Sequence, residues 1–185
     1  MVRAVELVKP QGIIHLGDGW RDVEELRGLF PSLPLEHVPG NCDFGRFEAL
    51  ERVLILDDHR VLIAHGHTLG VKTGLLRAQY RALEMNADIL LFGHTHVPLV
   101  DAASRPMMMN PGSIGDSRRP TYGVLEFRDG QIYPSSFGWT HNKKECTLRY
   151  ISFPFLTRSK RAPARAANYT KRPRSLRFWR RGGIS

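Results

Sequence analysis

Two histidines spaced two residues apart, His94 and His96, are the clearest candidates for chemistry in this sequence. They follow the apolar run 87–91, which is rich in strand-forming residues and predicts a buried strand. In an extended segment, the side chains at i and i+2 point to the same face, so both imidazoles can converge on one point. Neutral imidazole is a favoured ligand for Zn, Mn, Fe and Ni. An isolated pair fits a metal site and two ordinary surface histidines equally well.

Four more polar motifs share this placement, each directly after a short apolar segment. The five motifs in chain order are Gly17-Asp18, Gly40-Asn41-Cys42-Asp43, His65-Gly66-His67, Gly93-His94-Thr95-His96 and Asn110-Pro111-Gly112-Ser113. Each motif alone is weak evidence, because short combinations of this kind arise by chance. Open α/β sheets place their sites where strand ends cluster. The recurrence of polar motifs at strand ends therefore predicts one shared site.

The segments between the motifs predict strands and helices early in the chain and paired strands later. Strands are predicted at 12–16, 35–38, 52–56, 60–64, 87–91, 107–109, 122–127 and 131–137, and helices at 2–8, 22–29 and 74–86. The apolar face of helix 22–29 is predicted to be Val23, Leu26 and Leu29, and that of helix 74–86 to be Leu75, Leu76, Tyr80, Leu83 and Ala87. Pro98 is predicted to end regular structure after the histidine pair.

The order and spacing of the five motifs resemble the calcineurin-like metallophosphoesterase superfamily, and within it the YfcE-like branch of small phosphodiesterases. The resemblance covers roughly Val5 to Phe137. Its most specific parts are the segments 40–43, 65–72 and 92–98 followed by 110–113. It implies an α/β fold in which a two-layer β-sandwich is flanked by helices, with two metal ions at the strand ends. We expect the first strand of that fold to be missing here.

The resemblance also implies roles for individual residues. Asp18 is expected to bridge both metals, and Asn41, His65 and His94 to complete one metal site through an amide oxygen and two imidazoles. His96 is expected to bind the other metal. The mixed nitrogen and oxygen ligand set favours Mn, with Zn, Fe or Ni as alternatives, over Mg.

The implied activity is hydrolysis of small, nucleotide-like phosphodiesters by a metal-bound hydroxide that attacks phosphorus in line. Two cations about 4 Å apart lower the pKa of a bridging water and neutralise charge on the phosphoryl oxygens. The site residues implied for this chemistry are Asp18, Asn41, His65, His94 and His96.

One departure from the family pattern concerns the N-terminus. The family begins with a strand ending in Asp-x-His, which completes the metal site that includes His96, and no such strand precedes Val2. We therefore expect residues 1–137 to be a metallophosphoesterase domain that is incomplete at its N-terminus, with impaired activity. Asp57-Asp58-His59 has the right letters, but it is predicted to form the turn between strands 52–56 and 60–64.

A second departure is Cys42-Asp43, where phosphomonoesterase branches carry His-Glu, whose histidine is the usual general acid. Protonation of the leaving group then depends on water or on His67, for which a hydrogen-bonding or core role is an equal alternative. Cys42 is expected to be a small packed thiol rather than a nucleophile, because the sequence places no base beside it. His15, inside a strand, is expected to be packed or hydrogen-bonded.

Three cations follow the motifs, namely Lys72, Arg118 and Arg119. They fit contacts with a substrate phosphate and solvated surface charges about equally.

The composition suits a globular domain, with 42% hydrophobic and 24% charged residues among 185. No apolar run approaches the roughly 20 residues needed to cross a membrane. Two cysteines do not make a disulfide framework, so a reducing cytoplasm is the expected compartment. The sequence is compatible with a homo-oligomer and does not identify one.

The net charge of +9 comes from the C-terminal part of the chain. Residues 138–185 hold 13 Lys and Arg and one acidic residue, Glu145, hence +12, whereas residues 1–137 hold 14 basic and 17 acidic residues, hence −3. Such a basic segment is interpreted as a nucleic-acid-binding arm, a disordered extension, or sequence that is not native coding sequence. We favour the last, because the family resemblance ends near Phe137.

Two further functions are kept as alternatives to the enzyme. One is a non-catalytic protein-binding scaffold, since the superfamily includes a retromer subunit that uses this fold to bind proteins. The other is nucleic-acid binding through residues 138–185, which applies only if that segment is native.

Overall fold

The computed structural model describes residues 1–45, 47–116 and 118–138. In chain order, the elements are α1 (Val2–Val8), β1 (Ile13–His15), α2 (Trp20–Leu29), β2 (Leu35–His37), β3 (Glu51–Leu56), β4 (His59–Ala64), α3 (Leu76–Glu84), β5 (Ile89–Phe92), β6 (Leu99–Asp101), β7 (Met107–Asn110), β8 (Thr121–Arg128) and β9 (Gln131–Gly138). No helix within these ranges is long and apolar enough to cross a bilayer. The predicted basic segment lies outside the described residues, apart from Gly138.

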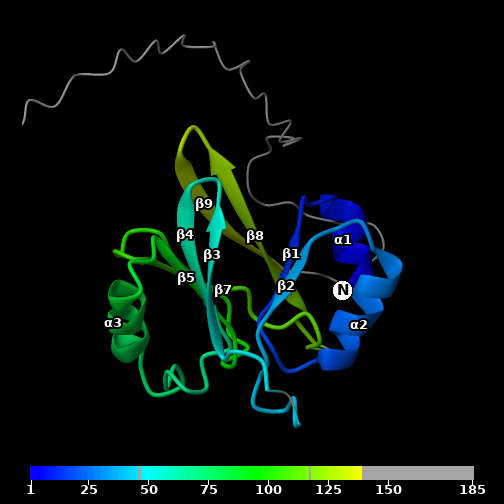
Figure 1. The fold of residues 1–185 in the computed structure, drawn as a ribbon, viewed down its shortest axis with the longest axis horizontal. Coiled ribbons are helices and arrows are strands. Elements are labelled where there is room, and N and C mark those ends of the chain that lie inside the picture. Colours follow the sequence, from blue (N-terminus) through cyan, green and yellow to red (C-terminus); the bar gives the residue numbers. More distant parts are fainter. Residues whose placement is uncertain (46, 117, 139–185) are drawn as a thin grey trace, which may run out of the picture. The chain divides into compact units, whose positions relative to one another are not determined.

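A five-stranded sheet with the order β3-β4-β5-β7-β6 forms the centre of the fold (Figure 1). Its three middle strands, β4, β5 and β7, are parallel, and the two edge strands run antiparallel to their neighbours. All four residues of β5 are buried, as are the last four of β4. Strands that are covered on both faces need such continuous apolar runs, which is why the sequence predicted them well.

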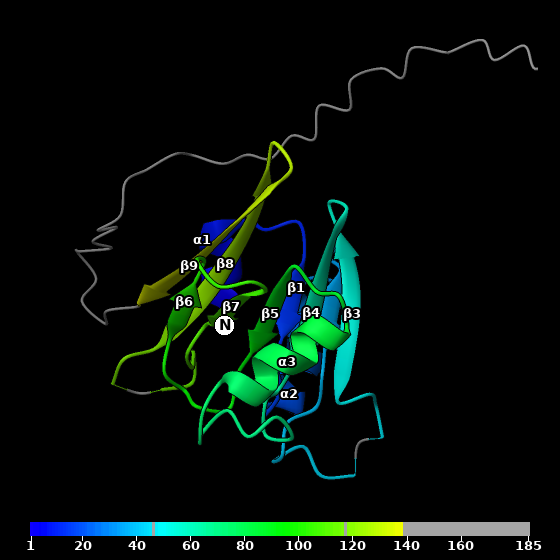
Figure 2. The same ribbon diagram turned by 90° about the vertical axis from the view of Figure 1, so that its left-hand side faces the viewer.

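Helix α3 covers one face of this sheet (Figure 2). Its fully buried residues are Ala78 and Ala82, which pack with Leu62, Leu90 and Phe92 of the sheet. Leu75 and Ala87, just outside the helix, also pack here, as predicted. The rest of the predicted apolar face is wrong, since Leu76, Tyr80 and Leu83 are all exposed. The two alanines are small enough to let the helix approach the sheet closely. This close approach is why the alanine side of the helix is buried and the leucine and tyrosine side is exposed.

The opposite face of the sheet packs against a second β layer, made of the parallel pair β1-β2 and the hairpin β8-β9. Val61, Ile63 and Leu91 of the sheet belong to one buried cluster with Val38, which follows β2, and Ile132 of β9. Helices α1 and α2 lie beside β1 and β2, on the side away from α3 (Figure 1). The predicted two-layer β arrangement with flanking helices is confirmed.

Helix α2 buries Val23 and Leu26 as predicted, but Leu29 is exposed. Strand β6 was not predicted, because Pro98 was expected to end regular structure. Pro98 itself lies outside regular structure, but β6 begins at the next residue and pairs with β7 at the edge of the described sheet. The turn prediction for Asp57 and Asp58 is confirmed, since they form the tip of the β3-β4 hairpin.

The close fit of α3 against the sheet leads to a stability prediction. Ala78→Leu adds volume where no space is left, so it is expected to lower the free energy of unfolding by about 1–3 kcal/mol. Leu83→Ala removes an exposed side chain of the same helix and is expected to change it by no more than about 0.5 kcal/mol. Urea unfolding of both variants tests this, and equal effects would contradict the assignment of the buried face.

Candidate metal centre

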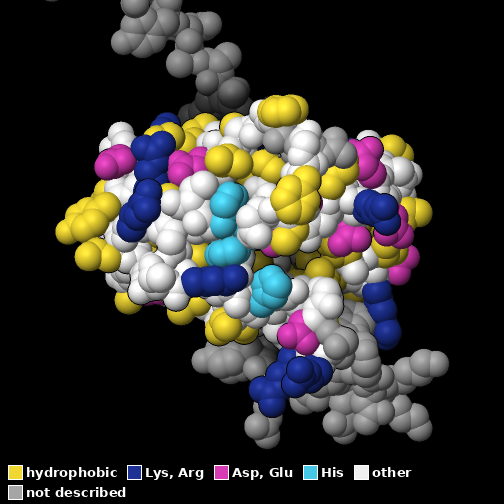
Figure 3. Space-filling model, turned by 90° about the horizontal axis from the view of Figure 1, so that it is seen from below, with side chains coloured by type: hydrophobic (Ala, Val, Ile, Leu, Met, Phe, Trp, Pro, Cys, Tyr) yellow, Lys and Arg dark blue, Asp and Glu magenta, His cyan; other side chains and the backbone are white. Residues whose placement is uncertain are grey.

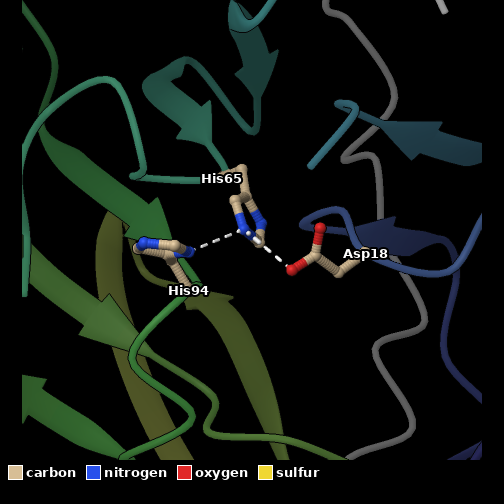
Figure 4. Close-up of side chains that lie close together, drawn as sticks. All are labelled: Asp18, His65 and His94. Atoms are coloured by element: carbon tan, nitrogen blue, oxygen red, sulfur yellow. Dashed lines mark hydrogen bonds and ion pairs between the residues drawn. The ribbon is translucent and has the colours of Figure 1, made fainter. Parts of the chain in front are cut away.

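Asp18, His65 and His94 form a compact cluster at the ends of β1, β4 and β5 (Figure 4). Their ligand atoms all lie within 4.8 Å of one another. His65 Nε2 lies 3.2 Å from Asp18 Oδ2 and 3.1 Å from His94 Nδ1. The side-chain oxygen of Asn41 is also 3.2 Å from His65 Nε2. The structure therefore brings together the four residues predicted for one metal site.

The hydrogen bonding of His65 explains why these groups suit a cation. His65 is almost fully buried, and its Nδ1 lies 2.6 Å from the carbonyl oxygen of Leu16. A carbonyl only accepts, so Nδ1 carries the hydrogen and, in the neutral ring, Nε2 presents a lone pair. Nε2 lies 3.2 Å from Oδ2 of Asp18 and from Oδ1 of Asn41, and 3.1 Å from Nδ1 of His94, so three neighbouring side chains present candidate ligand atoms around one point. Lone pairs that converge in this way fit a metal ion, and the Nδ1–H···O=C bond is the usual outer-shell support of a histidine ligand.

The backbone at the cluster adopts conformations that non-glycine residues rarely take. Asp18 and His94 have φ of 58° and 66°, in the left-handed region. Such strain collects at functional sites, where the surrounding structure maintains it. His96 has φ of 58° as well, so the premise that His94 and His96 lie in an extended segment is wrong.

His96 is exposed and does not belong to the three-residue cluster that the described residues form. Its imidazole is close enough to Asp116 to contribute to the lowered pKa of that carboxyl, after the backbone N–H groups of Arg118 and Arg119. The assignment of His96 to a second metal stays a prediction.

The loops that carry Asp18 and Asn41 approach each other closely at two glycines. A Cβ on Gly40 would collide with the Asp18 carboxylate, and one on Gly17 would lie 2.6 Å from the backbone nitrogen of Gly40. Gly17 also has φ of 96°, which side chains rarely adopt. Glycine at positions 17 and 40 thus lets the loops that carry Asp18 and Asn41 come together.

Asp43 holds the Asp18 loop in place, a role that the sequence did not reveal. Its carboxylate accepts hydrogen bonds from the backbone N–H groups of Asp18 and Gly40 at 2.8 Å, and from those of Gly19 and Trp20 at 3.0 Å. Burial would raise the pKa of Asp43, but these four N–H donors outweigh it and lower the pKa.

Asn110 positions the loop that carries His94. It is fully buried at the end of β7, and its Nδ2 donates to the carbonyl of Gly93 at 2.8 Å and to Thr95 Oγ1 at 3.0 Å. Its Oδ1 accepts from the N–H of Gly112 at 2.8 Å. Asn110 was recognised only as part of a motif, because its partners come from a neighbouring strand end.

Comparison with known protein families identifies the domain. Residues 1–130 match the family described as the calcineurin-like phosphoesterase superfamily domain. The chain belongs to this superfamily. The resemblance deduced from the five motifs is therefore confirmed.

Individual relatives agree with this assignment. The probable metallophosphoesterase YsnB of Bacillus subtilis strain 168 is 40% identical over 103 residues, which are 55% of this chain and 58% of that protein. The phosphodiesterase YfcE of Escherichia coli K12 is 29% identical over 100 residues, 48% of this chain and 50% of that protein. The chain thus spans between half and three fifths of the length of these relatives.

Solved structures agree on the fold. A predicted phosphoesterase from Streptococcus pneumoniae TIGR4 has a TM-score of 0.56 and 26% identity, covering 69% of this chain and 89% of that one. A Vps29 double mutant from Entamoeba histolytica has a TM-score of 0.58 with 18% identity, covering 76% and 89%. At that identity, the likeness to Vps29 concerns the fold alone.

His67 lies beside the cluster in this phosphoesterase domain, with its ring centre 5.3 Å from that of His65 and 6.1 Å from that of His94. Its Nδ1 is buried without a hydrogen-bond partner among the described residues. Burial is the largest cause that lowers the pKa of His67 and of His94, and the positive charge of Lys72 lowers that of His94 further. A lowered pKa favours the neutral imidazole, which is the form that binds metal.

Cys42 is exposed, so the expectation of a packed thiol is wrong. Its N–H donates to Asp18 Oδ1 at 2.8 Å, and the charge of Asp18 is the largest cause that raises the pKa of the thiol. A raised pKa keeps the thiol protonated, which agrees with the prediction that Cys42 is no nucleophile. His15 accepts a hydrogen bond from the N–H of Gly17 through Nδ1, as expected.

The three predicted phosphate contacts differ in their placement. Lys72 is exposed and lies near enough to the cluster to affect the pKa of His94. Arg118 and Arg119 are exposed on the loop after β7, where their backbone N–H groups donate to Asp116. Substrate binding by these residues and by His67 stays a prediction.

The four hydrogen bonds of Asp43 predict a pH-dependent stability in metal-free protein. Asp43→Asn is expected to lower the free energy of unfolding at pH 7 by about 1–3 kcal/mol, the loss for hydrogen bonds to a charged group. Because the folded-state pKa of Asp43 is lowered, this contribution is present above the unfolded pKa of about 3.9 and is lost as pH falls through the folded value. Urea unfolding in EDTA between pH 7 and pH 3 measures it, and a difference that does not shrink at low pH would refute the prediction.

The buried bonds of Asn110 predict an effect on metal binding. Asn110→Ala releases the loop behind His94 and is expected to weaken Mn²⁺ binding by about 10- to 100-fold, as for other outer-shell groups. Calorimetric titration measures this, with Ala78→Leu as a destabilised control that does not touch the loop. Equal losses in both variants would mean that general stability, rather than positioning of His94, governs affinity.

Proposed function

We propose that this domain is a metal-dependent phosphoesterase that hydrolyses small phosphodiesters. The observation that supports this best is the geometry of His65, whose Nε2 lies 3.2 Å from side-chain oxygens of both Asp18 and Asn41 while the Leu16 carbonyl accepts from Nδ1. An N/O donor set of this kind suits Mn²⁺, with Zn²⁺, Fe or Ni as alternatives. The relatives named metallophosphoesterase and phosphodiesterase support the same chemistry.

Asp18, Asn41, His65 and His94 would hold a divalent metal. When bound, the metal supplies Lewis-acid activation of water and neutralises charge on the phosphoryl oxygens. The Leu16 carbonyl accepts from Nδ1 of His65 and so leaves Nε2 facing the site. Asp43 and Asn110 hold the loops that carry Asp18 and His94 in position. Lys72, the cation next to His94, would attract the substrate phosphate.

The ligand sets for two metals are unequal among the described residues. Four residues serve the first metal, whereas the second is assigned only the shared Asp18 and the exposed His96. We expect this chain to bind one metal tightly and to hydrolyse phosphodiesters slowly. The scaffold alternative rests on the likeness of fold to Vps29, and the nucleic-acid alternative on residues outside the described part of the chain.

Histidine substitutions test the proposal. His94→Ala removes a ligand, so it is expected to weaken Mn²⁺ binding by more than about 100-fold, since even outer-shell losses reach that size. Hydrolysis of bis(p-nitrophenyl) phosphate should fall with it. His59→Ala, at the β3-β4 hairpin and outside the cluster, is the matched control and should change neither quantity.

The same assay separates the two metals. His96→Ala is expected to leave one tightly bound metal per chain. Unchanged Mn²⁺ affinity in His94→Ala would refute the site, and metal binding without any phosphodiester hydrolysis would refute the activity.

A further inference from the structure

Two phenylalanines after the ligand Asn41 lie almost entirely in water. Phe44 is 89% exposed and Phe47 is 98% exposed, more than any other large apolar side chain among the described residues. Single exposed apolar side chains are ordinary on protein surfaces, but two phenylalanines this exposed on one short loop call for an explanation. Because both rings are solvated, they contribute almost nothing to the core of this fold.

The loop that carries them starts within the candidate metal centre. Asn41 Oδ1 is 3.2 Å from His65 Nε2, and the next two residues hold the Asp18 loop through the Cys42 N–H and the Asp43 carboxylate. Phe44 follows Asp43 directly, so its Cα lies within about 11 Å of that of Asn41 along the chain. In Figure 1 this segment projects beyond the ends of β2 and β3, at the end of the fold where β4 and β5 finish.

The same end of the molecule carries the polar groups that would meet a phosphate. In Figure 3, which looks onto this end, histidine side chains gather in the middle beside a basic side chain, with hydrophobic side chains around them. Lys72 provides positive charge next to His94. An anionic group bound at the cluster would therefore have exposed aromatic rings within reach of whatever is attached to it.

We propose that Phe44 and Phe47 form a stacking surface for a nucleobase whose attached phosphate is bound at the cluster. A phenyl ring offers a flat apolar face, and stacking on aromatic side chains accepts every base. The phosphate bound at the cluster places the attached nucleoside beside the loop. This inference rests on the proposed function for the phosphoester chemistry, and base binding itself is measured without turnover.

The first test compares two ligands that differ only by a base. In the presence of Mn²⁺, calorimetry is expected to show that the wild-type protein binds AMP about 5- to 150-fold more tightly than ribose 5-phosphate, the range for one stacked base. In Phe44→Ala/Phe47→Ala this ratio should fall towards one, while binding of ribose 5-phosphate stays unchanged. Phe44→Trp/Phe47→Trp should keep the preference.

Tyr80→Ala is the matched control, because Tyr80 is an exposed aromatic residue on α3 with no assigned role in the site. It should leave the ratio unchanged. Since both phenylalanines are exposed, the thermal midpoint of the double alanine variant should match that of the wild type. A wild-type ratio near one, or an unchanged ratio in the double variant, overturns the inference.

Two further binding experiments distinguish a small nucleotide from single-stranded nucleic acid, and a nucleobase from a membrane surface. Binding of a dT8 oligonucleotide much more tightly than of thymidine 5′-phosphate would assign the surface to single strands rather than to small nucleotides. Phe-dependent binding to phosphatidylglycerol vesicles, without a preference for AMP, would overturn the inference in favour of a membrane contact. Base-dependent binding without hydrolysis of any phosphodiester would refute the proposed function and leave this inference standing.

Discussion

The hydrogen bond between His65 Nδ1 and the carbonyl of Leu16 is the interaction on which the site depends. His65 follows β4 of the central sheet, and Leu16 follows β1 of the second layer, so the bond joins the two layers at their shared end. It also decides that Nε2 is the nitrogen of His65 that faces Asp18, Asn41 and His94. One contact therefore links the packing of the fold to the chemistry of its candidate metal centre.

The other parts of the site act on backbone geometry rather than on the metal ligands themselves. Asp43 gathers four N–H groups around the Asp18 loop, and Asn110 ties Gly93 to Gly112 behind His94. Both hold residues with left-handed φ, a conformation that costs free energy and persists only under such constraint. The positions of the candidate ligands are thus set by hydrogen bonds that the Asp43 carboxylate accepts and that the Asn110 amide makes, although neither residue is itself a candidate ligand.

The central strands were predictable because burial on both faces demands continuous apolar residues, as in Ile89–Phe92. The buried face of α3 was not predictable, because the helix sequence carries two sets of apolar residues at helical spacing. One contains Leu76, Tyr80 and Leu83, and the other contains Ala78 and Ala82. Local periodicity cannot choose between them, and the sheet accepts the set that allows the closer approach. Strand β6 was missed because it is only three residues long and is defined by its pairing with β7, which the sequence around Pro98 does not indicate.

The sequence alone determined the family and predicted four metal ligands, because Asp18, Asn41, His65 and His94 belong to motifs whose order along the chain is itself distinctive. It also indicated that the motifs meet, because each follows a strand. Only the tertiary structure decided how the ligands are oriented. The tautomer of His65 depends on a carbonyl 49 residues away, and the Asp18 loop depends on a carboxylate 25 residues away. Contacts at such separations arise from layer packing, which no local pattern encodes.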